Sequence, residues 1–345
     1  MSDWTNHLAR AGACFGSSPL PPSVDFGTPY ADASALAHNA VAVPLLHLGL
    51  IRATGVEAGA FLHRLLSNDV AKLAGDAAQW TSFNTAQGRM LANFLLWREG
   101  CDLCLAASTD LLPDLLKKLS FYILRAKVKL FFPEQERVLI GLAGPRAGEY
   151  LSRVALPVPE ADMRQAVCAD RRTVRLNEGL FILDLPTAEA PASFDSLCQA
   201  GAAASGTASW QLATIRAGLP LVTAATQEAF VAQMLNFETI GVSFTKGCYP
   251  GQEIIARTQH LGKSKRRMFR IGLLAPASAS DIPAGMVLYS PSQEPGDRQA
   301  AGTLVNFAPL PEGGEALAII RTEYSSIGAE IRLGAPDGLR AQVLG

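Results

Sequence analysis

The sequence predicts an α+β protein in which two units of antiparallel strands and helices precede a small all-β barrel. Helical stripes alternate with hairpin patterns up to Arg270, and this arrangement occurs in two successive stretches. After Arg270 the chain contains only short apolar runs separated by Gly, Pro and Ser turns. We therefore predict domains over residues 1–134, 135–268 and 269–345.

The first predicted unit follows an N-terminal arm. Residues 1–40 are rich in Gly, Ser, Pro and Ala, which predicts an irregular segment with one short helix at most. The unit itself combines strands and two helices, and Thr109 or Asp110 is the expected cap of the second helix. We expect strands over 45–53, 80–84, 90–97, 101–107 and 127–131, and helices over 56–66 and 110–120.

The second unit repeats this mixture, and the barrel pattern follows it. A small-residue stretch over 198–208 predicts a loop or a helix, and Gly218 with Pro220 ends the next helix. The expected strands are 138–142, 173–176 and 180–183, with helices over 146–154 and 210–217, and the expected barrel strands are 286–289, 302–305, 316–320 and 330–333.

Composition limits the possible partners. Among 345 residues, 30 Lys and Arg balance 31 Asp and Glu, so the net charge is -1. This balance gives no global attraction to nucleic acid or to an anionic membrane, and any basic site must be local. No apolar run is long enough to span a bilayer, and the N-terminus lacks a signal pattern. We expect a cytoplasmic protein with no membrane partner.

The cysteines and histidines predict neither disulfides nor a metal site. Six cysteines are scattered through the chain, as is typical of a reducing compartment. Cys101 and Cys104 form a CxxC, but they fall on a predicted strand whose residues three apart face opposite ways, which favours a structural role. The five histidines show no zinc-ligand spacing, so we expect no metal.

The most distinctive stretch is residues 246–253 (KGCYPGQE), which contain two glycines and a proline directly before an apolar helical pattern. Pro250 suits a first helical turn, which places Cys248 just outside the helix. Unpaired N–H groups there stabilise a thiolate, and Lys246 adds a second positive charge. A buried, structural cysteine is the alternative, because free cysteines are usually buried.

Charged residues follow this stretch. Gln252 and Glu253 fall in the expected first turn of the helix, where Glu253 either contributes to a site or only caps the helix, and Arg257 is placed to pair with it. A basic run then begins, which favours an anion site or, alternatively, a solvated strand edge. Its members are Lys263, Lys265, Arg266, Arg267 and Arg270.

Residues 246–257 (KGCYPGQEIIAR) resemble the signature of the YgfZ family, which is related to the glycine-cleavage T-protein (aminomethyltransferase) and to mitochondrial iron–sulfur assembly factors. Residues 54–58, 67–70, 83–90 and 217–220 are similar to further family motifs, and the likeness covers most of residues 45–270. The resemblance implies two α+β units and a barrel, arranged in a T-protein-like ring around a central hole that holds a reduced folate.

The resemblance also implies site residues. Polar contacts to the pterin of tetrahydrofolate, or of a one-carbon derivative, would come from Asn84, Gln233, Asn236 and Glu238, with Tyr249 beside them. Each of the four polar residues, taken alone, is more typical of a surface or turn residue than of a folate contact. Cys248 and Lys246 would carry the chemistry, Gly247, Gly251, Gln252, Glu253 and Arg257 would support it, and the basic run would bind a polyglutamate tail or RNA phosphate.

Two departures from the T-proteins bear on activity. T-proteins carry paired aspartates where this chain has Ala92 and Asn93. Neither Ala nor a neutral amide replaces a carboxylate that orients a reacting amine, so glycine-cleavage chemistry is disfavoured. Arg216 also stands where relatives usually have an acidic residue, so either the pterin contact has moved or this position is a solvated helix end.

Three functions remain open from the sequence. The first is a folate-binding accessory protein that supports iron–sulfur client enzymes, including those that modify tRNA, through Cys248 as a redox-active or cluster-contacting thiol. The alternative is a folate-dependent aminomethyl or one-carbon transferase with an unknown acceptor. An RNA-binding module that acts through the basic run is possible but not favoured.

Overall fold

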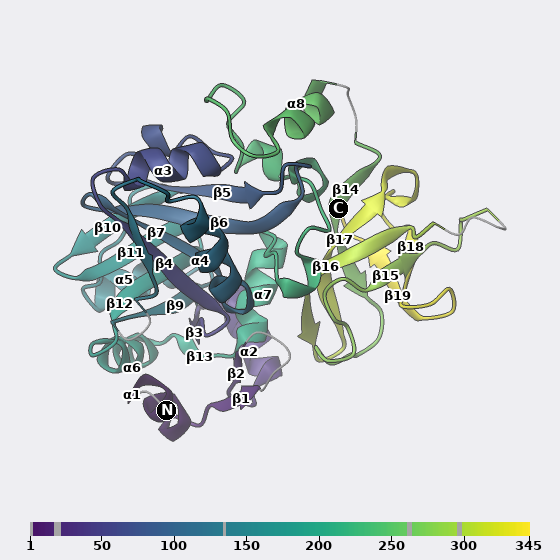
Figure 1. Cartoon of the computed structure of the whole chain (residues 1–345). Helices are drawn as coiled ribbons and strands as arrows, with labels where there is room; N and C mark the ends of the chain where they lie inside the picture. Colours follow the sequence, from purple (N-terminus) through teal and green to yellow (C-terminus); the bar gives the residue numbers. More distant parts are fainter. Residues whose placement is uncertain (1–2, 17–21, 134–135, 261–263, 295–298) are drawn as a thin grey trace. The chain divides into compact units, whose positions relative to one another are not determined.

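The computed structural model describes residues 3–16, 22–133, 136–260, 264–294 and 299–345 (Figure 1). The chain forms two compact units, each assembled from segments that are separate in sequence. Unit 1 comprises Met1–Arg64, Asp69–Trp80 and Phe94–Ala213, and unit 2 comprises Leu65–Asn68, Thr81–Asn93 and Thr214–Gly345. Antiparallel sheets, helices and a closed C-terminal barrel confirm the predicted α+β class. The sequence boundaries at residues 134 and 268 stay a prediction.

A five-stranded sheet has the strand order β5-β6-β7-β4-β8, as the predicted hairpins require. Its inner strand β6 buries every residue from Met90 to Trp97, because the run MLANFLLW has few polar side chains to expose. The strands are β4 (Leu48–Thr54), β5 (Ala78–Asn84), β6 (Met90–Glu99), β7 (Asp102–Ser108) and β8 (Lys129–Phe131); helices α3 (Ala58–Leu65) and α4 (Leu112–Phe121) and the 3₁₀ turns η1 (Val70–Lys72) and η2 (Thr109–Leu111) accompany them.

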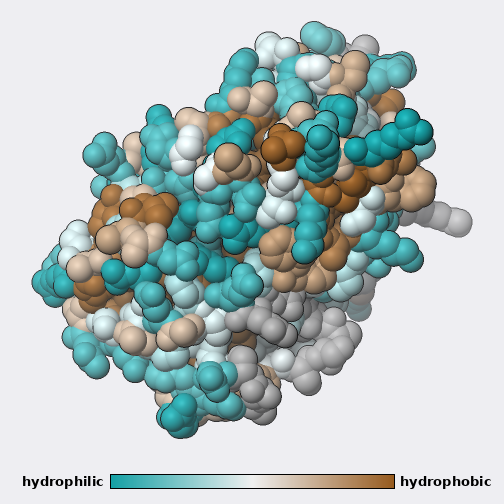
Figure 2. Space-filling view, turned by 60° about the vertical axis from the view of Figure 1, so that its left-hand side comes forward, coloured by the Kyte–Doolittle hydropathy of each residue, from teal (hydrophilic) through white to brown (hydrophobic). Residues whose placement is uncertain are grey.

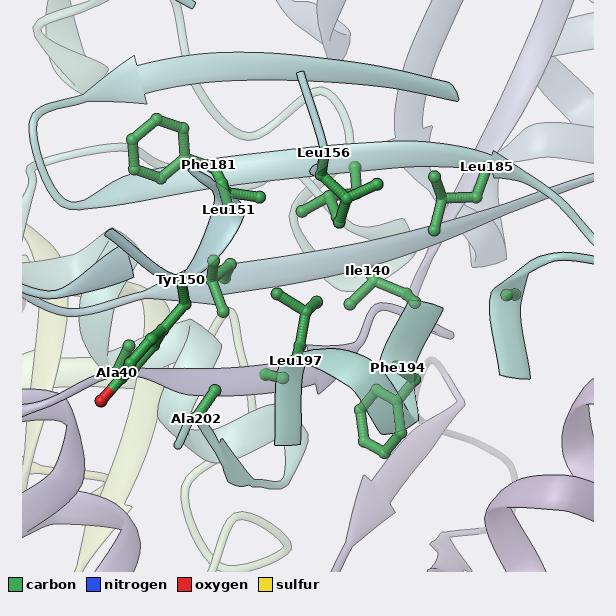
Figure 3. Close-up of a cluster of buried hydrophobic side chains, with 14 of the residues drawn as sticks. Ala40, Ile140, Tyr150, Leu151, Leu156, Phe181, Leu185, Phe194, Leu197 and Ala202 are labelled. Carbon is green, nitrogen blue, oxygen red and sulfur yellow. The ribbon is translucent and has the colours of Figure 1, made fainter. Parts of the chain in front are cut away.

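A six-stranded sheet in unit 1 has the order β10-β11-β12-β9-β3-β13, with all pairings antiparallel except that of β13 with β3. Its strands and helices enclose an apolar core, part of which Figure 3 shows, with Ile140, Phe181, Phe194 and Leu197 among its members. The elements are β3 (Val41–Pro44), β9 (Arg137–Ala143), β10 (Arg164–Cys168), β11 (Arg171–Asn177), β12 (Leu180–Pro186), β13 (Ala203–Ala204), α5 (Ala147–Arg153) and α6 (Ala190–Ala200).

The N-terminal segment is more regular than predicted. It contains α1 (Asp3–Arg10), β1 (Cys14–Gly16), β2 (Ser23–Asp25) and α2 (Pro29–His38), so the expectation of one short helix at most is wrong. Helix α1 buries Trp4 and Leu8, and the Trp4 ring meets the Phe194 ring edge-on at 5.7 Å. A helix this short depends on such tertiary packing, which local sequence does not reveal.

Two further expectations need correction. Helix α6 was not expected, and the small-residue stretch beginning at Cys198 is its end, closed by Gly201 at φ 117°. The helix predicted over 110–120 begins at Leu112 after a 3₁₀ turn, and no side chain caps it. In both places the sequence signal indicated a boundary, but its position depended on the packing of neighbouring elements.

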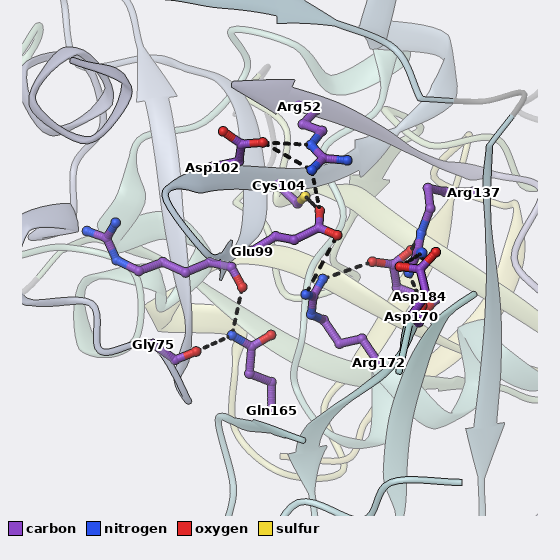
Figure 4. Close-up of polar contacts among 11 residues, drawn as sticks. Arg52, Gly75, Glu99, Asp102, Cys104, Arg137, Gln165, Asp170, Arg172 and Asp184 are labelled. Atoms are coloured by element: carbon purple, nitrogen blue, oxygen red, sulfur yellow. Dashed lines mark hydrogen bonds and ion pairs between the residues drawn. The ribbon is translucent and has the colours of Figure 1, made fainter. Parts of the chain in front are cut away.

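Unit 1 also contains a cluster of charged side chains that links its two sheets (Figure 4). Asp184 on β12 is buried and lies 2.7 Å from Arg137 and 3.3 Å from Arg172. Glu99 on β6 lies 3.2 Å from Arg52 and 4.0 Å from Arg172. These pairs neutralise charges that burial would otherwise penalise heavily.

The CxxC lies beside this cluster. The Cys104 thiol is buried and donates a 3.5 Å hydrogen bond to Glu99, and burial raises the pKa of this thiol. Cys101 is exposed, and both cysteines are free. The predicted structural role of the CxxC is therefore consistent with where the two thiols lie.

Unit 2 ends in a closed barrel, as predicted. Its strand order is β14-β17-β16-β15-β18-β19. Buried aliphatic side chains such as Ile271, Leu304 and Ile331 fill it. Its strands are β14 (Arg266–Leu273), β15 (Val287–Tyr289), β16 (Gly302–Leu310), β17 (Gly313–Arg321), β18 (Glu330–Leu333) and β19 (Leu339–Val343), with the turn η6 (Thr322–Tyr324). Before the barrel come α7 (Thr207–Arg216), which begins in unit 1, η3 (Ala224–Thr226), η4 (Ala232–Leu235), η5 (Phe237–Thr239) and α8 (Gln252–His260).

The described helices are all too short or too polar to cross a membrane. Hydrophilic side chains cover much of the face drawn in Figure 2, and apolar side chains gather there in separate patches.

Candidate functional site

The KGCYPGQE stretch leads into helix α8, which begins two residues after Pro250 and has Gln252 and Glu253 in its first turn, as expected. The helix begins at Gln252, so Pro250 lies in the preceding turn and not in the first helical turn. The backbone N–H of Gln252 donates to the Tyr249 carbonyl over 3.2 Å and closes this turn. Cys248 is consequently four residues before the helix and not adjacent to it.

Gly251 holds this turn against the β5–β6 hairpin. Its φ of 81° is in the left-handed region, and a Cβ atom there would lie 2.5 Å from the Thr85 carbonyl oxygen and 2.6 Å from the Gly88 Cα. Gly88 has a φ of 72° and faces Ile254 of α8. Two motifs that are far apart in sequence therefore meet through a pair of glycines, since only glycine permits this approach of two backbones.

Cys248 and Gly247 are both exposed. A Cβ on Gly247 would meet no atom within 4 Å, so packing of the chain itself does not require glycine there. The alternative that Cys248 is a buried structural cysteine is wrong, and its sulfur is accessible to a partner or a ligand.

Lys246, in contrast, is buried. Its Nζ donates a 2.5 Å hydrogen bond to the Leu66 carbonyl and lies 5.0 Å from the centre of the Tyr249 ring. Burial raises the pKa of Tyr249 to about 12, so the ring stays a neutral phenol at ordinary pH. These contacts give Lys246 and Tyr249 an anchoring role, and the expected influence of Lys246 on the thiol stays a prediction.

Four side chains that the sequence singled out for folate share one property. Each has a buried polar atom without a hydrogen-bond partner among the described residues. The atoms are Asn84 Nδ2, Gln233 Oε1, Asn236 Oδ1 and Glu238 Oε2. Other buried side chains of the described residues, such as Trp97 and Thr173, also have an unpaired polar atom, so this property alone does not identify a site. The four atoms remain available to a ligand or to ordered water.

In three of these side chains the second polar atom of the amide or carboxylate has a partner within unit 2. Gln233 Nε2 donates to the Ile255 carbonyl of α8 over 2.7 Å, and Asn236 Nδ2 donates to the Met268 carbonyl of β14 over 2.9 Å. Glu238 Oε1 lies 2.6 Å from Arg267. Asn236 itself adopts φ 55°, a left-handed conformation that Asn tolerates better than most residues. The three side chains are thus fixed, and their unpaired atoms are presented in a set direction.

Asn84 is held by a network of buried hydroxyls that the sequence did not reveal. The Ser82 hydroxyl donates to Asn84 Oδ1 over 3.2 Å and also lies 2.9 Å from the Ser67 hydroxyl. Ser67 in turn donates to the Gly241 carbonyl over 2.6 Å. In the sequence, residues 67–70 stand out only as part of a family motif. The alternation of small polar residues on β5 was the signal that could have identified this network.

Comparisons with known proteins agree with these motifs. No family model matches the chain. The tRNA-modifying protein YgfZ of Photorhabdus laumondii subsp. laumondii is 30% identical over 267 residues, which are 75% of this chain and 78% of that protein. The chain belongs to the YgfZ family. The YgfZ of Yersinia pseudotuberculosis serotype O:1b is 29% identical over 266 residues, again 75% of this chain and 78% of the relative.

One solved structure shows the fold of this YgfZ-family chain. The aminomethyltransferase T of the glycine cleavage system from Bartonella henselae superimposes with a TM-score of 0.80, covering 99% of this chain and 95% of that protein. Its sequence identity of 20% is too low to transfer activity.

The three residues that differ from the T-proteins make structural contacts in this YgfZ-family chain. Asn93 is buried, donates to the Pro220 carbonyl over 2.7 Å and accepts from the Val222 N–H over 2.9 Å. Both ends of its amide are therefore used, and Ala92 beside it is an apolar core residue. Arg216 is the exposed last residue of α7 and lies 2.6 Å from Glu315 on β17, so it is a solvated helix end that also forms an ion pair.

The basic run is divided by the structure. Arg267 pairs with Glu238, and Arg270 lies 3.8 Å from Glu315. Both belong to β14, which pairs with β17 along its whole length but with β19 only from Ile271 to Leu273. The alternative of a strand edge therefore stays open for the basic residues at the start of β14. Arg266 donates to the Ala300 carbonyl over 3.4 Å. Lys263 lies outside the described residues, and an anion-binding role for Lys265, Arg266 and Arg267 stays a prediction.

The remaining motif residues lie on α8. Gln252 is half-buried, while Glu253 and Arg257 are exposed. Among the described ion pairs none joins Glu253 to Arg257, so the expected pairing is not formed in this structure. Within the described parts of the chain, no three His, Cys, Asp or Glu side chains gather in a way that could hold a metal ion.

Proposed function

We propose that this YgfZ-family chain is a tetrahydrofolate-binding accessory protein that supports iron–sulfur client enzymes, including those that modify tRNA. The relatives are named tRNA-modifying proteins, which supports the second half of the proposal. The unpaired buried atoms of Asn84, Gln233, Asn236 and Glu238 carry the first half.

These four residues fit the chemistry of a reduced pterin. The pterin ring presents N–H donors beside a carbonyl acceptor, and the side chains offer one unpaired amide donor and three unpaired oxygen acceptors. An unpaired buried group costs roughly 1–3 kcal/mol, so a ligand that satisfies several of them gains affinity from each. When bound, reduced folate supplies a carrier for one-carbon groups, and the chain's residues fix the orientation of its ring.

An accessory role is better supported than aminomethyl transfer. Asn93 has no charge, and both ends of its amide are occupied by Pro220 and Val222. It therefore offers a substrate amine neither a carboxylate nor a spare acceptor. The alternative of a one-carbon transferase with another acceptor would need a different group to position that acceptor.

The accessible thiol suggests how the protein would reach its clients. Cys248 is exposed in a turn that Gly251 and the buried Lys246 fix in place. A thiol held in this way can contact an iron–sulfur enzyme or its cluster without unfolding of the turn. Iron–sulfur proteins are accordingly the proposed partners.

Folate binding is tested by calorimetric titration with tetrahydrofolate. Asn84→Asp keeps the shape of the side chain but replaces the unpaired donor with an acceptor, so we expect at least a tenfold higher Kd, or about 1.4 kcal/mol. Asn177→Asp is the matched control, because only the oxygen of Asn177 is used, as acceptor of the Gly179 N–H. Equal affinities of wild type and the Asn84 variant would contradict this site.

The role of the thiol needs a separate measurement. We expect Cys248→Ser to bind tetrahydrofolate like the wild type but to lower the activity of an iron–sulfur tRNA-modifying enzyme in cells that depend on this protein. The modified nucleoside in bulk tRNA can be quantified by mass spectrometry. Full modification with the Ser variant would remove the thiol from the mechanism and leave the folate site intact.

A further inference from the structure

The segment from the end of α4 to β8 is strongly basic. Residues 117–129 contain no Asp or Glu. Its cations are Lys117, Lys118, Arg125, Lys127 and Lys129, and all of them are exposed except Lys118, which is half-buried. In a chain with a net charge of -1, this is a local concentration of positive charge.

These five cations form no ion pair within the described parts of the chain, unlike the arginines of β14, which pair with Glu238 and Glu315. The Glu57 carboxylate does approach the segment. It accepts a hydrogen bond from the backbone N–H of Lys127 over 2.7 Å, so the loop backbone and not a lysine amine occupies it. Lys129 Nζ lies 5.4 Å from the centre of the Phe131 ring, a contact that does not neutralise its charge. The positive charges are thus available to an external anion.

Apolar side chains lie among the cations. Phe121 is 79% exposed, Tyr122 is 46% exposed and Leu124 is 88% exposed. The Phe121 and Tyr122 rings meet edge-on at 6.0 Å, and the high exposure of Phe121 leaves much of its ring open to solvent. Exposure of several large apolar side chains in one short segment usually marks a contact surface.

The segment folds back on itself between α4 and β8. Backbone hydrogen bonds from Tyr122 to Leu119, from Ala126 to Ile123 and from Val128 to Ala126 fold the chain back from α4 to β8. β8 pairs with β4 and forms the edge of the five-stranded sheet. We call this the α4–β8 surface, made of Lys117, Phe121, Leu124, Arg125, Lys127 and Lys129.

Ordinary structural roles explain only some of the exposed side chains of the α4–β8 surface. Lys118 complements the C-terminal end of the α4 dipole, and Lys129 is suited to an edge strand, where charge discourages aggregation. Neither role accounts for Arg125 and Lys127, nor for an aromatic ring left almost fully in water beside them.

We propose that the α4–β8 surface binds single-stranded RNA, with the cations on phosphates and an unpaired base stacked on Phe121. Cations that follow a backbone and exposed rings that stack on bases are how proteins hold single strands without reading their sequence. An anionic bilayer is a poorer fit, because the apolar face of α4 (Leu112, Leu115 and Leu119) is buried and cannot enter lipid. The proposal does not depend on folate, since this surface belongs to unit 1 and the folate candidates belong to unit 2.

The phosphate contacts are tested by fluorescence anisotropy with a labelled RNA of about 20 nucleotides, long enough to cover one such site. We expect the double variant Lys127→Glu/Lys129→Glu of the full chain to raise the Kd at least tenfold. Loss of two phosphate contacts should also reduce the slope of log K against log salt by about 1.4. The control Arg10→Glu/Lys72→Glu makes the same change of net charge on other exposed elements, and we expect it to weaken binding less than threefold.

The stacking contact has its own signature. Phe121→Ala should raise the Kd roughly fivefold or more without changing the salt slope, because stacking releases no counterions. Phe121→Trp should restore affinity and add a fluorescence signal that the RNA quenches. Phe121 is exposed, and circular dichroism checks that the two variants stay folded.

Three outcomes would overturn the proposal. The first is an equal loss of affinity in the variants of the α4–β8 surface and in the control variant, because the attraction would then depend only on net charge. The second is wild-type affinity in the Lys127/Lys129 and Phe121 variants. The third is wild-type protein that binds vesicles containing phosphatidylglycerol but not the RNA, which would make this a lipid surface.

Discussion

At the scale of single residues, buried polar atoms without partners divide into two kinds. His47 is 3% exposed and its Nδ1 has no partner among the described residues, yet it can avoid a penalty by staying neutral. Burial lowers its pKa to about 4, which keeps the ring uncharged at pH 7. Asn84 cannot avoid the penalty in this way, because an amide does not titrate, and Glu238 has one oxygen on Arg267 and the other without a partner among the described residues. Under the proposed function, a ligand satisfies these two atoms.

His47 makes stability depend on pH. Its pKa is lower in the folded chain than the ordinary 6.5, so its contribution is complete above pH 6.5 and is lost as the pH falls toward 4. We expect about 2 kcal/mol less stability at pH 5 than at pH 8 from this residue. Urea unfolding at the two pH values measures it. His47→Gln should abolish that part of the difference, whereas His260→Gln, at an exposed position, should leave it unchanged.

At the scale of elements, the site depends on one contact between the β5–β6 hairpin and the turn before α8. The sequence marked both elements by their glycines, but it could not show that they touch. Gly88 and Gly251 face each other across a distance that excludes any side chain. This contact places α8, whose Ile255 carbonyl holds Gln233, next to the strand that carries Asn84.

Gly251→Ala should therefore be costly. The new methyl group would collide with the Thr85 carbonyl in a left-handed backbone, and we expect a loss of about 1–3 kcal/mol. Gly247 lies four residues earlier in the same motif, where a Cβ would meet no atom, so Gly247→Ala should change stability by less than about 0.5 kcal/mol. Thermal unfolding of the two variants compares them directly. Equal stability losses would mean that the close approach does not constrain the turn.

At the scale of the whole molecule, the two proposed sites belong to different units. The folate candidates lie in unit 2, and the α4–β8 surface lies in unit 1. Each unit has its own buried core, one around Ile140 and one around Ile271. Binding at one site is then expected to be independent of binding at the other.

This independence can be measured. Tetrahydrofolate at about 100 times its Kd should stabilise the protein by about 2.7 kcal/mol. Lys127→Glu/Lys129→Glu should keep this stabilisation, and Asn84→Asp should keep the RNA affinity, each within about twofold of the wild type. A larger change in either direction would reveal a coupling free energy between the sites.

The fold class, the order of most elements and the family follow from the amino-acid sequence alone. They do so because hydrophobic periodicity and glycine-rich turns are local signals, and residues 246–257 are a specific motif. The N-terminal helix α1 and helix α6 were missed, since contacts such as Trp4 with Phe194 stabilise them.

The contacts of the candidate residues, in contrast, can be seen only in the folded structure. It assigned Asn93 to the Pro220 and Val222 backbone, Lys246 to the Leu66 carbonyl and Arg267 to Glu238, and it left Cys248 exposed. The physical reason is that hydrogen bonds and burial depend on neighbours far apart in the chain. A residue's type states which bonds it can form, but only the fold determines which of its atoms remain for a ligand.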